Sequence, residues 1–159
     1  MPKLLYAEFR SPSEVTSSRF TVSQLRRLFY VSRTPDQVDP RVVNAILAES
    51  RRLNRQRDVT GALAYSGQYF AQVLEGDAEY LSALLQRIAR DPRHRDLTVV
   101  FEQSITRRDY GEWSMGYLYD AKLSDELEGL LGQTAQPRRV ADDTLPQRIF
   151  AHISDPANP

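Results

Sequence analysis

The sequence predicts an α+β fold, a ferredoxin-like sandwich in which a five-stranded sheet (order βαββαββ) carries two helices on one face. Two observations predict it. Each of two segments with helical periodicity lies between segments typical of strands, and two of the strands are joined by a glycine turn. The 159 residues suit one domain, which we place at residues 24–120, between an N-terminal arm (1–23) and a C-terminal extension with short helices (121–159).

The first strand is expected at residues 25–32, which are rich in branched and aromatic side chains. Every second residue, Tyr30 among them, should point to the same face. The first helix should begin at Asp39 and Pro40, because Asp accepts hydrogen bonds from free backbone amides and Pro fits the first helical position. We expect this helix to run to about Arg55.

The next two strands are expected at residues 59–65 and 69–74, joined by a short turn that contains a glycine, which is a hairpin signal. A second helix should start after Asp77 and end at Asp91 and Pro92, since the residue before a proline is disfavoured in a helix. Its apolar side carries Leu81, Leu84, Leu85 and Ile88.

A fourth strand is expected at residues 97–105 and a fifth at residues 113–118. Beyond them, residues 124–131 and 145–153 show short amphipathic patterns. Three roles remain open for these segments: covering the other face of the sheet, forming an oligomer contact, or releasing a partner.

The composition excludes several classes of site. The chain contains no cysteine, which excludes disulfides, cysteine-ligated metals, thiol nucleophiles and flavin chemistry through a thiol adduct. The 21 basic and 21 acidic residues balance, which argues against direct binding of nucleic acid. Apolar runs are too short for a secretory signal or a membrane span, so we expect a cytoplasmic protein without membrane contact.

Polar residues interrupt the inward face of the first helix. Ile46, Ser50 and Asn54 follow one another at intervals of four residues, although an inward stripe is normally apolar. A buried Asn without a partner costs about 1–3 kcal/mol. If Asn54 is buried, its carboxamide must therefore bond to the backbone, to a loop or to a ligand; alternatively, Asn54 lies near the frayed end of the helix.

A second polar residue lies in the middle of the third expected strand. Gln72 shares one face with Phe70 and Leu74. If that face meets the helices, the amide needs a partner, and Tyr30 is the nearest candidate because its phenol both donates and accepts. If the face is exposed to water, no partner is needed.

The second helix carries a similar mixture. Arg87, Ile88 and Asp91 lie on one stripe, where Arg87 and Asp91 form either an ordinary surface ion pair or polar contacts to a ligand. Ile46 and Ile88 would then cover the faces of a flat heteroaromatic molecule held between the two helices, and the polar groups would satisfy its edge.

Several strings resemble those of the BLUF family, blue-light sensors that use FAD. The resemblance covers residues from about Leu25 to Leu118, in the family's order and spacing. Its strings are LRRLFYVSR (25–33), ILAESRRLN (46–54), VTGALAYSGQYFAQVLEG (59–76), LLQRIARDPRH (84–94) and WSMGY (113–117). It implies a ferredoxin-like sandwich with the flavin ring between the two helices.

The resemblance also implies residue roles. Tyr30 matches the family's photoactive tyrosine and Gln72 its switching glutamine, while Trp113 and Met115 match a fifth-strand pair whose placement near the glutamine reports the signalling state. Leu53 stands where several relatives have a polar residue, so one hydrogen bond to the flavin is expected to be absent. The positions that match flavin-binding residues are Tyr30, Ile46, Ser50, Asn54, Gln72, Arg87, Ile88, Asp91 and His94.

The implied function is that of a photoreceptor without substrate turnover. Light would drive an electron and a proton from Tyr30 to the flavin and back, Gln72 would finish rotated or tautomerised, and the absorption would shift to the red. The cofactor is expected to be FAD, with FMN or riboflavin as possible substitutes, and His94 is expected on its phosphate side. The signal would pass to an effector protein in trans, and we expect a homo-oligomer.

Two other functions use this kind of fold. A hydrolase of the acylphosphatase type would need an Arg and an Asn, for which Arg87 and Asn54 are available, but it would leave Tyr30 and Gln72 unexplained. An RNA-binding module would need exposed aromatic side chains at paired positions and a basic surface, which the sequence lacks.

Overall fold

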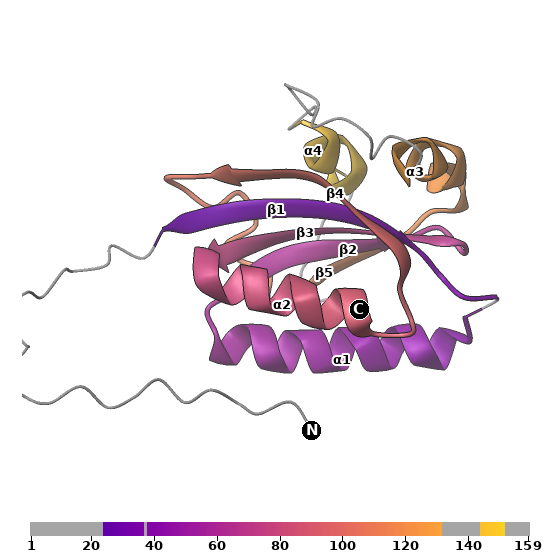
Figure 1. Ribbon diagram of the computed structural model, residues 1–159, viewed down its shortest axis with the longest axis horizontal. Helices are drawn as coiled ribbons and strands as arrows, with labels where there is room; N and C mark the ends of the chain where they lie inside the picture. Colours follow the sequence, from indigo (N-terminus) through magenta and orange to yellow (C-terminus); the bar gives the residue numbers. More distant parts are fainter. Residues whose placement is uncertain (1–23, 37, 132–143, 152–159) are drawn as a thin grey trace, which may run out of the picture.

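The computed structural model describes residues 24–36, 38–131 and 144–151, so the N-terminal arm and the end of segment 145–153 lie outside the described residues. Its elements are β1 (Leu25–Arg33), α1 (Pro40–Gln56), β2 (Thr60–Tyr65), β3 (Tyr69–Asp77), α2 (Ala78–Arg90), β4 (Arg95–Ser104), β5 (Gly116–Tyr119), a 3₁₀ turn (Ala121–Leu123), α3 (Ser124–Leu131) and α4 (Leu145–Phe150). The predicted ferredoxin-like α+β fold is confirmed (Figure 1).

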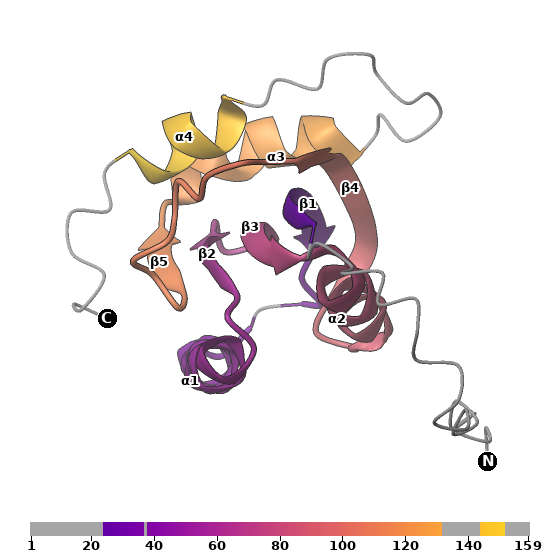
Figure 2. The same ribbon diagram turned by 90° about the vertical axis from the view of Figure 1, so that its left-hand side faces the viewer.

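The sheet has the strand order β4-β1-β3-β2-β5. Its strands pair antiparallel except for β2 and β5, which are parallel. Helices α1 and α2 cover one face, and α3 and α4 cover the other, as Figure 2 shows. The two C-terminal segments therefore take the first of the three roles left open by the sequence, because their apolar side chains pack on the far face of the sheet.

The helix boundaries follow the predicted capping signals. The carboxylate of Asp39 accepts from the backbone N–H of Arg41, and that of Asp77 accepts from the N–H of Tyr80. Helix α2 ends at Arg90, and Asp91, the residue before the proline, caps it with an extended backbone, as expected.

Both faces of the central strands are buried. Along β1, Leu28 and Tyr30 belong to the core under α1 and α2, whereas Phe29 and Val31 belong to the core under α3 and α4. Gln72 lies on the same side as Tyr30 and is only 4% exposed. The alternative that its face of the sheet is open to water is therefore wrong.

The expected fifth strand is shorter than predicted. It begins at Gly116 rather than at residue 113, so Trp113 and Met115 precede it. In this segment the bonds to neighbouring elements alternate: the carbonyl of Trp113 accepts from the Gly61 N–H of β2, whereas that of Ser114 accepts from the Asn54 side chain and that of Met115 from Arg51 Nε. Helix α1 therefore supplies partners here that a regular strand would not use.

Within the described ranges, the helices are too short or too polar to cross a lipid bilayer. The same residues hold no cluster of three or more His, Asp or Glu side chains placed to bind a metal ion.

Candidate functional site

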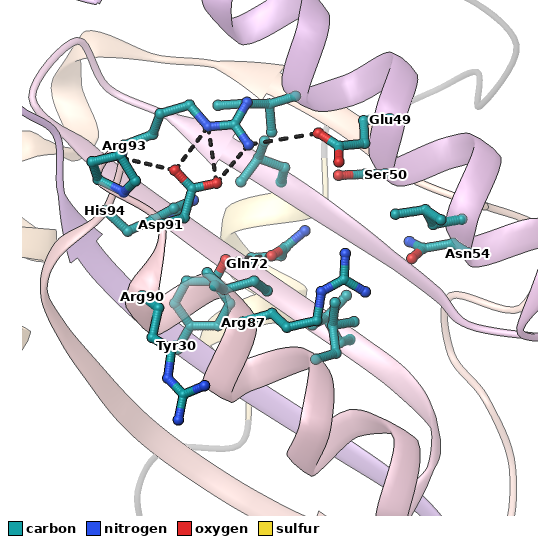
Figure 3. Close-up of a pocket in the computed structure, with 17 residues that line it drawn as sticks. Tyr30, Glu49, Ser50, Asn54, Gln72, Arg87, Arg90, Asp91, Arg93 and His94 are labelled. Atoms are coloured by element: carbon teal, nitrogen blue, oxygen red, sulfur yellow. Dashed lines mark hydrogen bonds and ion pairs between the residues drawn. The ribbon is translucent and has the colours of Figure 1, made fainter. Parts of the chain in front are cut away.

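A cavity of about 530 Å³ lies between α1, α2 and the sheet. A cavity of this size suits a small-molecule ligand. The nine positions that sequence analysis singled out for cofactor binding all line it: Tyr30, Ile46, Ser50, Asn54, Gln72, Arg87, Ile88, Asp91 and His94 (Figure 3). In that view, Asn54 lies at one end of the group and His94 with Asp91 at the other, with Tyr30 and Gln72 between them.

Apolar side chains from four elements complete the walls. Leu53 comes from α1, Leu63 and Leu74 from the sheet, and Leu84 from α2. The sequence pattern placed Leu84 on the apolar side of its helix but did not separate wall residues from ordinary core residues. A leucine that packs against a ligand and one that packs against another side chain have the same periodicity.

Tyr30 and Gln72 form a hydrogen bond in the floor of the cavity. They are paired residues in the β1–β3 register, and the Tyr30 hydroxyl donates to Gln72 Oε1. Complete burial raises the pKa of Tyr30 strongly, and the negative charge of Asp91 raises it further. The phenol is therefore neutral at pH 7 and remains a donor.

The other end of the Gln72 carboxamide faces Met115. Gln72 Nε2 donates to the sulfur of Met115 at 3.3 Å, and both side chains are buried. The oxygen of the carboxamide thus contacts a phenol, and its nitrogen contacts a thioether. Rotating the carboxamide would turn Nε2 toward the phenol and Oε1 toward the sulfur, which has no proton to donate.

Asn54 joins α1 to the segment before β5. Its Nδ2 donates to the carbonyl of Ser114 at 2.7 Å, while Arg51 Nε donates to the carbonyl of Met115 at 3.0 Å. A loop is therefore one partner of the Asn54 carboxamide. The second N–H of Nδ2 and the carboxamide oxygen remain to donate to and accept from a ligand.

Trp113 does not line the cavity. Its ring packs on the α3/α4 side of the sheet, with its centroid 6.1 Å from that of Tyr110. Met115 and Trp113, two residues apart, therefore lie on opposite sides. The segment that joins them connects the cavity to the far face.

Asp91 is paired with Arg93, rather than with Arg87 as the helical spacing suggested. Arg93 Nε lies 2.9 Å from Oδ1 and 3.0 Å from Oδ2, and these bonds lower the pKa of Asp91. Sequence reasoning missed Arg93, although it belongs to the string DPRH, because helical spacing says nothing about a residue beyond the end of the helix. It also missed Glu49, which lies 3.6 Å from Arg93 on α1.

His94 closes the floor of the cavity beside Tyr30. Its Nδ1 lies 2.8 Å from the Ser32 hydroxyl, and its ring packs against Tyr30 and Phe70. Burial lowers the pKa of His94 to about 4, although the charge of Asp91 acts in the opposite direction. The imidazole is therefore neutral at pH 7.

The arrangement fits a flat heteroaromatic ligand with a polar edge. Ile46 and Ile88 stand on opposite walls, and Asn54, Gln72 and Arg87 supply both acceptors and donors. Hydrogen bonds already fix Gln72 and Asn54, so their orientation is set before a ligand binds.

Comparison with known proteins gives a consistent result. The family model "Sensors of blue-light using FAD", BLUF, matches residues 25–116. The chain is 37% identical over 95 residues to the photoactivated adenylate cyclase subunit beta of Euglena longa, covering 58% of this chain and 11% of that protein. The chain thus corresponds to about a tenth of the length of this curated relative.

Two solved structures are similar over most of this chain. The dark-state structure of BlrB, a BLUF protein, has a TM-score of 0.63 and 30% identity, covering 81% of this chain and 97% of BlrB. Klebsiella pneumoniae BlrP1 with FMN and cyclic diGMP has a TM-score of 0.60 and 30% identity, covering 82% of this chain and 35% of BlrP1.

Proposed function

Since the chain belongs to the BLUF family, the sensors of blue light using FAD, we propose that it is a photoreceptor that holds a flavin non-covalently between α1 and α2 and signals to a partner protein. The observation that carries this proposal is the series Tyr30–Gln72–Met115, a phenol, a carboxamide and a thioether joined by hydrogen bonds, of which the first two line the cavity and the third lies buried behind them.

The residues that would hold the flavin form two groups, one apolar and one polar. Ile46 and Ile88 would cover the faces of the ring, and Asn54, Gln72 and Arg87 would bond to its polar edge. FAD is the proposed cofactor, and FMN is a possible substitute, as supported by the similar BlrP1 structure with FMN. A bound flavin supplies the absorption of blue light and an excited state that accepts an electron.

Tyr30 is the proposed electron donor. Its phenol is neutral in the dark, and loss of an electron makes the phenolic O–H strongly acidic. Gln72 Oε1 already accepts from that hydroxyl, so the carboxamide lies on the route of the proton. The charge returns afterwards, and Gln72 remains rotated or tautomerised.

The change in Gln72 has a direct consequence for Met115. In the dark, Nε2 donates to the Met115 sulfur. After a rotation, Oε1 would face the sulfur, which cannot donate, so the contact would be lost. The Met115 side chain would then be free to move, while Asn54 and Arg51 still hold the backbone of this segment. Two residues before Met115, the Trp113 ring contacts Tyr110 on the far face.

The far face is the proposed route of output. The Tyr110 ring packs against Phe150 of α4, with centroids 6.1 Å apart, so a shift of this segment would move a contact with the C-terminal helix. The Euglena relative is a cyclase subunit, which supports signalling to an effector. For this chain we propose an effector protein in trans, a homo-oligomer and no substrate turnover.

The test is spectroscopic. The protein is purified in the dark, supplied with FAD and illuminated with blue light. We expect a yellow protein whose absorption shifts reversibly to the red. Failure to bind any flavin would contradict the proposal, and bleaching without a reversible shift would contradict the hydrogen-bond switch.

A further inference from the structure

A second cavity, of about 380 Å³, is lined by residues from the start of α1, from β2 and from β5. Its volume is in the range that suits a small-molecule ligand. Because β5 is an outer strand of the sheet, this cavity lies at the edge of the fold (Figure 2). It shares no lining residue with the cavity between α1 and α2, so it is a separate candidate site.

Three tyrosines form one side of the second cavity. Tyr65 and Tyr119 are paired residues in the register of β2 and β5, and Tyr117, two residues before Tyr119, shares its face of the sheet. The rings of Tyr65 and Tyr119 have centroids 5.9 Å apart and are inclined at 53°. Two inclined rings make a corner, and a ligand in that corner can contact both.

The inner ring of this group is held in place without a ligand. The Tyr65 hydroxyl donates to the carbonyl of Gly67 at 3.0 Å, and the Tyr65 ring packs against Phe70 with centroids 5.0 Å apart. Tyr65 is only 7% exposed, whereas Tyr119 is 59% exposed and forms the rim. The cavity thus has a fixed inner wall and an opening to solvent.

No charged side chain lines the second cavity among the residues that the structure describes. This is unusual for the tyrosines of this protein. Outside the two cavities, each described tyrosine has an arginine of the same chain over its ring, at 5.5 to 5.9 Å from the centroid: Arg27 over Tyr110, Arg33 over Tyr69 and Arg57 over Tyr80. In the described part of the chain, no arginine takes that place over Tyr65, Tyr117 or Tyr119.

A cation is the ligand that such a place favours. The face of an aromatic ring is negative and attracts a cation within about 6 Å of its centroid, and quaternary ammonium groups are bound in this way by groups of aromatic rings. The methyl groups of such a cation would also pack against the aliphatic side chains of Val38 and Val43. Charge and shape therefore point to the same class of ligand.

The start of α1 does not oppose a cation. The N-terminus of a helix carries partial positive charge, but the carboxylate of Asp39, directly before Pro40, caps α1 and offsets it. Arg41, which pairs with Asp39, has a side chain that is 90% exposed and does not line the second cavity.

We propose that the second cavity is a binding site for a small alkylammonium ligand, held by cation–π contacts with Tyr65, Tyr117 and Tyr119. The tyrosines supply the attraction for the charge, and the aliphatic side chains of α1 and of the residue before Asp39 supply apolar contact. This site is independent of the flavin, so it goes beyond the proposed function and does not rest on it.

The experiment is a titration of the full chain, kept dark, with choline chloride, followed by saturation-transfer NMR of the choline methyl protons. The matched ligand is the neutral alcohol in which a carbon atom replaces the nitrogen of choline, and potassium chloride controls for ionic strength. We expect choline to bind in about the millimolar range and the neutral alcohol to bind about tenfold more weakly. Added FAD should leave both affinities unchanged.

Two substitutions at the exposed rim separate the ring from its hydroxyl. Tyr119→Leu keeps an apolar side chain but removes the ring, and it should weaken choline binding about fivefold. Tyr119→Phe keeps the ring and should retain the affinity within about twofold. The affinity for the neutral alcohol should be nearly the same in all three proteins.

Four outcomes would overturn the inference. Equal affinity for choline and the neutral alcohol would mean that the charge is not recognised, and an absence of choline binding would remove the site. An equal loss in Tyr119→Phe and Tyr119→Leu would assign the contact to the hydroxyl, and unchanged binding in both would place choline elsewhere. Loss of choline binding on addition of FAD would also overturn it, because the cation would then occupy the cavity between α1 and α2.

Discussion

Tyr30 and Gln72 are direct partners across the β1–β3 ladder, and the phenol of the first donates to the carboxamide of the second. They are 42 residues apart in the sequence. Neither side chain is accessible from outside the cavity, since Tyr30 is fully buried and Gln72 nearly so. A change in the hydrogen bonding of either side chain therefore acts directly on the other side chain rather than on solvent.

Tyr30→Phe removes the donor to Gln72 and leaves its carbonyl oxygen unpaired. We expect flavin binding to persist, because the ring of Phe fills the same space, and the reversible red shift to be abolished. Absorption spectra before and after blue light measure this. Tyr65→Phe is the control, since Tyr65 belongs to the same core but bonds to Gly67, and it should retain the shift. A normal shift in Tyr30→Phe would contradict the role assigned to this phenol.

Met115→Leu keeps the volume of the side chain but removes the acceptor for Gln72 Nε2. Trp113 is the only tryptophan in the sequence, so its fluorescence reports on the segment before β5. We expect the unmodified protein to show a light-dependent change in this fluorescence. Met115→Leu should keep the red shift and lose that change. Loss of both would mean that Met115 is needed for the photochemistry, in contradiction to its role as a relay.

Asn54→Ala removes a ligand acceptor and the bond to the Ser114 carbonyl together. We expect flavin affinity to fall about tenfold, in line with the loss of a buried hydrogen bond. Titration with FAD in the dark measures it. Asn44→Ala, at an exposed position of the same helix, should leave the affinity unchanged. Equal affinities of the two variants would count against the contact at the ring edge.

His94 should make stability depend on pH. Burial lowers its pKa in the folded protein from 6.5 to about 4. Between these values the unfolded chain binds a proton that the folded protein does not, so stability falls as the pH is lowered. We expect a loss of about 2 kcal/mol between pH 7.5 and pH 5.

Urea unfolding at the two pH values tests this loss, with His94→Asn as the comparison. The variant should lose clearly less stability than the unmodified protein over the same interval. Asp91 does not interfere, because its pKa is lowered from an ordinary value of 3.8 and it stays charged at pH 5. The same pH dependence in both proteins would rule out His94 as its source.

Glu75 anchors the loop before Trp113 from the far side of the sheet. It is fully buried, bonds to Arg27 at 2.7 Å, and accepts from the backbone N–H groups of Asp109 and Tyr110. Glu75→Gln removes the buried counter-charge of Arg27 and leaves it only the partly exposed carboxylate of Asp109, 2.8 Å away. We expect a loss of about 1–3 kcal/mol in the free energy of unfolding.

A neighbouring pair on β1 is the matched control. Arg26 and Glu102 lie 2.8 Å apart, but both side chains are more than a third exposed. Glu102→Gln should therefore cost less than about 1 kcal/mol. Comparable costs for the two substitutions in urea unfolding would show that burial of the Glu75 pair does not govern its strength.

The sequence by itself determined most of the elements and which of their residues face the helices. Capping residues such as Asp39 and Asp77, the turn near Gly67 and the alternation along β1 are local signals, so they do not depend on distant parts of the chain. The lining positions could be named because the resemblance supplied them, and because polar residues on inward faces stood out from their surroundings.

Only the tertiary structure decided which groups bond to one another. The carbonyls of Ser114 and Met115 bond to α1, Asp91 pairs with Arg93, and Trp113 lies on the opposite face from Met115. Each of these depends on where a loop passes relative to an element far away in the sequence. Periodicity fixes the face on which a side chain lies, but a hydrogen bond requires a distance and an angle that only the assembled sheet and helices provide.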